Sequence, residues 1–142
     1  IYFDMLGDRR TRSSYLAMQL LNFLHLPLLA AFVVTGAAIQ VLLSAAGALA
    51  GAATRWCFGG GVTLILFMIG ALCLIMQEDE ISTALTHKIV KLLALAGLAV
   101  LLASYLCLGA TVPVYLAAIA AILLLTILFG TKLWFAHSLF ES

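Results

Sequence analysis

The most prominent feature of this sequence is its shortage of charge. No Asp, Glu, Lys or Arg occurs in the stretches 15–54, 57–76 and 92–131, and charged residues make up only 9% of the 142 residues. Hydrophobic residues make up 65% and the mean hydropathy is +1.23, whereas soluble domains are about 45–50% apolar and about 25% charged. A water-soluble core of this size could not bury so much apolar surface, so a soluble globular domain is excluded.

Other features that the sequence lacks exclude further classes of function. The three cysteines, Cys57, Cys73 and Cys107, lie in or beside apolar stretches without a CxxC motif, which argues against a disulfide framework or a thiol-exchange centre. A net charge of +1 leaves no basic patch of the kind that binds nucleic acid. No catalytic triad, zinc motif or paired acid and base is found, so we expect neither an enzyme nor a metal site.

The uncharged stretches are long enough to be membrane-spanning helices, because about 20 apolar residues cross the roughly 30 Å hydrocarbon layer. Trp56 suits a membrane interface, and Pro113 suits the first turn of a helix. The sequence predicts an all-α polytopic membrane protein, an antiparallel bundle of four transmembrane helices in residues 13–142, at about 13–46, 56–76, 82–108 and 113–134. Residues 1–12 are interpreted as a basic linker after the end of an earlier helix, because Tyr2 and Phe3 resemble a helix end.

The basic residues predict the orientation of these spans. In this arrangement six of the seven lie on one side, and Arg55 stands alone on the other. Loops rich in Lys and Arg stay in the cytoplasm, which predicts that both termini and the acidic stretch 78–80 face the cytoplasm, or the equivalent compartment of an organelle. The six residues that share the cytoplasmic side are Arg9, Arg10, Arg12, Lys88, Lys91 and Lys132.

The candidate site residues come from a polar stripe in the first span. Gln19, Asn22 and His25 recur every three residues, Gln40 falls in the same broad arc, and Pro27 is expected to kink the helix beside His25. Polar side chains inside membranes usually face a bundle interior or a cavity, which makes Asn22, His25 and Gln40 candidate ligand-binding residues. Hydrogen bonding between helices is the alternative interpretation.

Three further features have a functional and a structural interpretation. His25, His87 and His137 fall in the same half of the membrane; no cofactor is predicted, and haem or chlorin ligation through His25 is the alternative. Asp4 is either a ligand-binding acid near a membrane boundary or a solvated terminal acid. The glycine run 59–61 could cradle an anion with its amides, although helix packing or a hinge is the favoured interpretation.

The order Tyr2-Phe3-Asp4, an arginine-bearing linker, and then His25-Leu26-Pro27 resembles the C-terminal portion of the low-temperature-requirement A (LtrA) membrane family. The resemblance covers most of the chain. It implies a longer polytopic membrane protein in which Asp4 and His25 occupy motif positions. It implies no defined biochemical activity.

Two functions are therefore expected as alternatives. The first is a non-enzymatic membrane module, similar to the end of an LtrA-like protein, that contributes to ligand binding or solute passage. The second is a structural or cofactor-holding small subunit of a larger membrane complex. Both imply the lipid bilayer and other membrane helices or subunits as partners, and neither implies nucleic acid.

Overall fold

The part of the chain that the structure describes is helical. A computed structural model describes residues 15–45, 49, 51–75, 80–107 and 109–138, which form four helices. All four are long and apolar enough to cross a membrane. The prediction of an all-α chain with four such helices is confirmed for these residues. The helices are α2 (Tyr15–Ser44), α3 (Ala52–Ile75), α4 (Glu80–Leu106) and α5 (Val112–Ser138).

The start of α3 differs from the sequence expectation. The second helix was expected to begin near Trp56, but α3 begins at Ala52 and the amide of Arg55 already donates to the carbonyl of Gly51, with N and O 3.0 Å apart. Alanine is the best helix former, so residues 52–53 extend the helix toward its N-terminus. Arg55 consequently belongs to the first turn of a helix and not to a loop.

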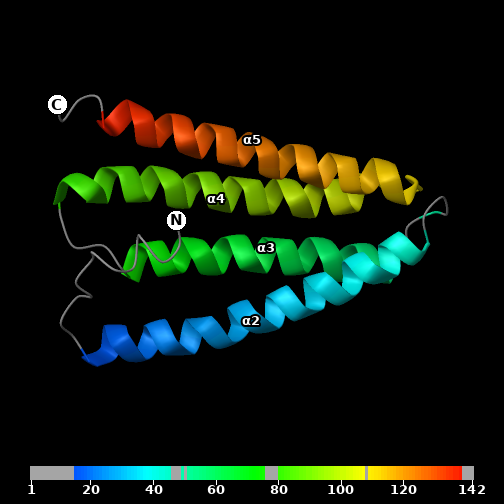
Figure 1. The fold of residues 1–142 in the computed structure, drawn as a ribbon, viewed down its shortest axis with the longest axis horizontal. Helices are drawn as coiled ribbons and strands as arrows, with labels where there is room; N and C mark the ends of the chain where they lie inside the picture. Colours follow the sequence, from blue (N-terminus) through cyan, green and yellow to red (C-terminus); the bar gives the residue numbers. More distant parts are fainter. Residues whose placement is uncertain (1–14, 46–48, 50, 76–79, 108, 139–142) are drawn as a thin grey trace.

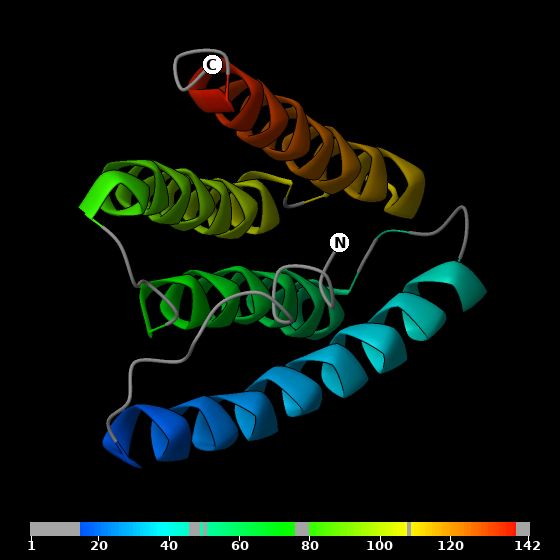
Figure 2. The same cartoon turned by 60° about the vertical axis from the view of Figure 1, so that its left-hand side comes forward.

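The helices pack in chain order as an open row (Figure 1). α3 packs on α2 and α4, α4 also packs on α5, and α2 and α5 form the outer edges of the row in both Figure 1 and Figure 2. Along the colour sequence, α2 and α4 run in one direction across Figure 1, and α3 and α5 run in the other. The turn after α2 and the turn after α4 therefore lie at the same end, where Leu49 and Thr111 form an isolated antiparallel bridge.

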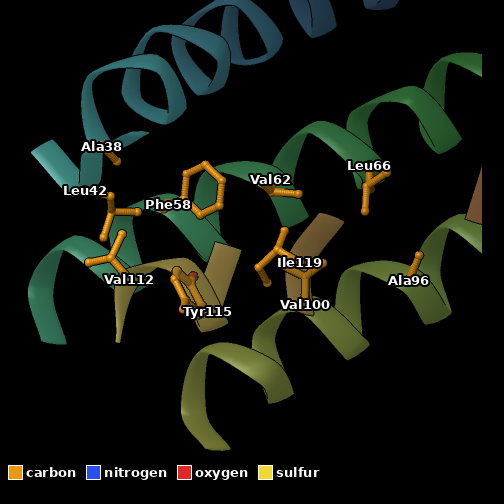
Figure 3. Packing of buried hydrophobic residues seen from close by; sticks show 10 residues of the cluster. All are labelled: Ala38, Leu42, Phe58, Val62, Leu66, Ala96, Val100, Val112, Tyr115 and Ile119. Carbon is orange, nitrogen blue, oxygen red and sulfur yellow. The ribbon is translucent and has the colours of Figure 1, made fainter. Parts of the chain in front are cut away.

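The hydrophobic core is concentrated toward this turn end of the row. Side chains from all four helices meet there, with Leu42 of α2 and Phe58 of α3 beside Val112 and Tyr115 of α5 (Figure 3). The Phe58 and Tyr115 rings pack edge to face, with their centroids 6.0 Å apart. The buried members of the core are Ala38, Leu42, Phe58, Val62, Leu66, Ala96, Val100, Val112, Tyr115 and Ile119.

Glycines bring α3 close to its neighbours. A Cβ at Gly59 would overlap Ser104 Oγ of α4, and a Cβ at Gly61 would overlap Thr35 Oγ1 of α2. Gly60, between them, has nothing within 4 Å of a Cβ position. The close contacts of Gly59 and Gly61 support the packing interpretation of this run, because a larger residue at either position would push two helices apart.

Candidate functional site

A buried cation lies at the turn end of the row. Arg55 is only 3% exposed, and its guanidinium Nη1 donates a hydrogen bond to the carbonyl of Cys107, just beyond the end of α4. The carbonyls at the end of a helix carry partial negative charge, so a cation at this position is stabilised. Within the described residues, the Arg55 Nε atom is buried without a hydrogen-bond partner.

The carbonyl that Arg55 contacts belongs to a tight turn. The Cys107 oxygen also accepts a hydrogen bond from the amide of Ala110, with N and O 3.0 Å apart. Gly109 within this turn has φ of +89°, a left-handed conformation that glycine adopts without steric cost. The turn thus presents the Cys107 carbonyl to α3, and Arg55 joins the start of α3 to the end of α4.

Two hydroxyl groups extend the contact to α5. The Tyr115 hydroxyl donates to the backbone carbonyl of Arg55 at 3.1 Å, and it lies 2.9 Å from Ser104 Oγ. Ser104 Oγ also donates to the carbonyl of Val100 at 2.9 Å. Both side chains are essentially inaccessible, at 0% exposure for Tyr115 and 1% for Ser104. Residues from three helices therefore form one network, the Arg55–Ser104–Tyr115 cluster.

The chemistry of this cluster is that of a structural contact. Its hydrogen-bond acceptors are backbone carbonyls and the two hydroxyl oxygens, so the cluster itself contains no imidazole or carboxylate that could activate either hydroxyl. Two hydroxyl protons are shared among three contacts, which leaves none for an incoming substrate. Among the described residues, no three His, Cys, Asp or Glu side chains are grouped to hold a metal ion. The cluster joins the ends of three helices.

Sequence reasoning missed this cluster. Arg55 was interpreted only as the single basic residue of the non-cytoplasmic side, and Ser104 and Tyr115 were not identified at all. One local signal exists, namely Gly59 one helical turn after Arg55, which marks a position of close helix approach. Nothing in the spacing of Arg55, Ser104 and Tyr115 could have shown that they meet.

The predicted ligand-binding residues are not brought together with the cluster. Asn22 and Gln40 are both exposed on α2. The sequence suggested instead that they face the interior between the four helices. They are exposed because the face of α2 that packs on α3 is the opposite one, marked by buried Leu28 and Ala31. Asp4 lies outside the described residues. A ligand-binding role for these residues stays a prediction.

His25 is half-buried within α2. Its ring Nδ1 lies 2.6 Å from the carbonyl oxygen of Leu21 and donates to it, because a carbonyl cannot donate. Pro27, two residues later, lies inside the helix without ending it. His87 is exposed on α4, and the side chain of His137 lies outside the described part.

Comparison with known proteins found no match: no family model, no curated protein and no solved structure matches the chain.

Proposed function

We propose that this chain is a non-enzymatic, integral membrane module that crosses the bilayer four times in antiparallel fashion and serves as a structural unit of a larger membrane assembly. The observation that carries this proposal is the distribution of apolar surface. Exposed large hydrophobic side chains occur on all four helices, for example Phe32, Leu64, Leu98 and Phe129. Water-soluble proteins do not expose contiguous apolar surface on this scale, but lipid solvates it.

The polar interior supports a structural role over catalysis or solute passage. Thr63 Oγ1 donates to the carbonyl of Gly97 at 3.0 Å, and Ser104 and Tyr115 are hydrogen-bonded within the cluster. Hydrogen bonds of this kind hold neighbouring membrane helices together. A transported solute needs polar side chains that line a path, whereas these groups bond to the protein itself. Solute passage would require helices beyond these four.

The proposal also includes the orientation of the helices in the membrane. The basic residues at both chain ends and at the start of α4 favour a cytoplasmic location for the termini and for residues 78–80, with the turn after α2 on the opposite side. Membership of the LtrA family, suggested by the residues around Asp4 and His25, is a further part of the proposal and contributes no activity to it.

Cysteine labelling in cells tests insertion and orientation together. In a background with Ala at positions 57, 73 and 107, we expect a membrane-impermeant maleimide to label Leu49→Cys in intact spheroplasts. Gln77→Cys should react only after the membrane is permeabilised. The protein should also stay with the membrane pellet at alkaline pH. Labelling of both positions from one side, or release of the protein by alkaline carbonate, would contradict the proposal.

A further inference from the structure

One face of α2 has a regular pattern and no partner among the residues that the structure describes. Its exposed residues recur at alternating intervals of three and four, the spacing with which one helix packs along another. We call this face the outer seam. It consists of Gln19, Asn22, Leu26, Leu29, Val33, Gly36, Gln40 and Leu43, all of which are exposed.

The outer seam points away from the rest of the row. The opposite face of α2 contains Leu28, Ala31, Ala38 and Leu42, which are buried, and α2 packs on α3. Val33, near the middle of the outer seam, is 72% exposed. The two faces lie on opposite sides of the same helix, so burial on α3 leaves the outer seam free to contact another molecule.

The polar residues of the outer seam make contact with lipid alone energetically unfavourable for this face. Gln19, Asn22 and Gln40 are the only Asn or Gln side chains in the four described helices, and all three lie on this face. None takes part in the hydrogen bonds between described side chains and their neighbours. A carboxamide left against hydrocarbon without a partner is costly, and such groups in membrane helices usually face protein.

We infer that the outer seam binds the same seam of a second copy of this chain, in a parallel α2–α2 pair related by a two-fold axis along the membrane normal. The inference rests on the proposed membrane insertion, because two copies inserted in the same orientation have parallel α2 helices. Each residue of the seam then meets its own counterpart at the same depth. A carboxamide both donates and accepts hydrogen bonds, so Asn22 pairs with Asn22 and Gln40 with Gln40.

The geometry of the seam suits this pairing. Asn22 and Gln40 are eighteen positions apart, which is about 27 Å along a helix and less than the roughly 30 Å of the hydrocarbon layer, so both carboxamides fit inside that layer near its two edges. The two amide pairs therefore hold both ends of the interface. Gly36 lies between Val33 and Gln40 and has nothing within 4 Å of a Cβ position, so its bare backbone permits a close approach of the second helix.

Cross-linking in membranes tests the proposed pair with the full chain. In the background with Ala at positions 57, 73 and 107, Val33→Cys places one thiol in the middle of the seam. Leu125→Cys places a thiol on the exposed face of α5 and is the matched control. On mild oxidation in native membranes we expect a disulfide-linked dimer of Val33→Cys and essentially none of Leu125→Cys. Equal cross-linking of both, or of neither, would overturn the inference.

A second measurement separates the seam from general membrane association. The apparent association constant is measured by energy transfer between labelled copies in phosphatidylcholine vesicles. We expect this constant to fall roughly tenfold for the variant Gly36→Leu, and roughly tenfold for the double variant that combines Asn22→Leu with Gln40→Leu. Ala121→Leu, a matched enlargement on the exposed face of α5, should leave it unchanged. Unaltered transfer in the α2 variants would refute the pairing, even if maleimide labelling confirms four spans. Failed insertion would instead refute the proposed function.

Discussion

The hydroxyl of Tyr115 donates a hydrogen bond to the backbone carbonyl of Arg55, sixty positions earlier in the chain. This bond connects the first turn of α5 to the first turn of α3, and the Arg55 side chain connects α3 to the Cys107 carbonyl beyond α4. Three helix ends are therefore joined at the turn end of the row. We expect this end to be the most stable part of the fold, because its contacts are buried and link distant segments.

Replacing Tyr115 with Phe tests the network directly. The ring remains packed on Phe58, but the hydrogen bonds to the Arg55 carbonyl and to Ser104 Oγ are lost. We expect the free energy of unfolding in mild detergent, measured by titration with SDS, to fall by about 1–2 kcal/mol. Tyr105→Phe is the control because Tyr105 is exposed, and it should change the free energy of unfolding little. Equal effects of the two substitutions would contradict a role for the Tyr115 hydroxyl.

Two adjacent glycines offer a matched pair of substitutions in α3. Gly59→Ala forces a Cβ into Ser104 Oγ, whereas Gly60→Ala places its Cβ in open space. We expect Gly59→Ala to lower the free energy of unfolding by about 1–3 kcal/mol through overpacking. Gly60→Ala should raise it by up to about 1 kcal/mol because alanine is the better helix former. Thermal unfolding followed by tryptophan fluorescence provides the comparison, and a neutral Gly59→Ala would refute the close packing of α3 on α4.

The contact between α2 and α3 can be tested by compensation. A Cβ at Gly61 would overlap Thr35 Oγ1, an atom that donates to the carbonyl of Ala31 at 2.7 Å. Gly61→Ala alone should destabilise the protein by about 1–3 kcal/mol, because the branched Thr35 side chain has little freedom to move. Thr35→Ala in the same molecule should restore most of that loss. A double-mutant cycle on unfolding free energies measures the coupling, and simple additivity would contradict the contact.

Substitutions at Arg55 separate the effect of its charge from that of its volume. Arg55→Met keeps most of the volume, and the Cys107 carbonyl retains its hydrogen bond from Ala110. Met cannot donate the hydrogen bond to the Cys107 carbonyl, so we expect the free energy of unfolding to fall by about 1–3 kcal/mol, offset in part because no charge has to be buried. Arg55→Glu buries a negative charge beside the carbonyls that end α4 and should be far more damaging.

The measurement for Arg55 is the yield of folded protein and its melting temperature in detergent. If Arg55→Met were as damaging as Arg55→Glu, the guanidinium would be essential in itself. An Arg55→Met protein as stable as the unsubstituted protein would contradict the assignment of Arg55 as the residue that joins α3 to the end of α4.

The sequence determined the length and the apolar character of the four described helices. Long stretches without charge allow helices of membrane-spanning length and little else, and this inference needs no knowledge of contacts between distant residues. The sequence also placed Asn22 and Gln40 on one side of a helix, because helical periodicity relates the angular positions of residues within a single helix.

Only the tertiary structure decided which side of α2 packs on α3, and it placed Asn22 and Gln40 on the exposed side. Periodicity relates residues to one another but carries no information about the direction of a neighbouring helix. For the same reason the meeting of Arg55, Ser104 and Tyr115 depends on how three helices are packed, and it cannot be inferred from their spacing in the chain.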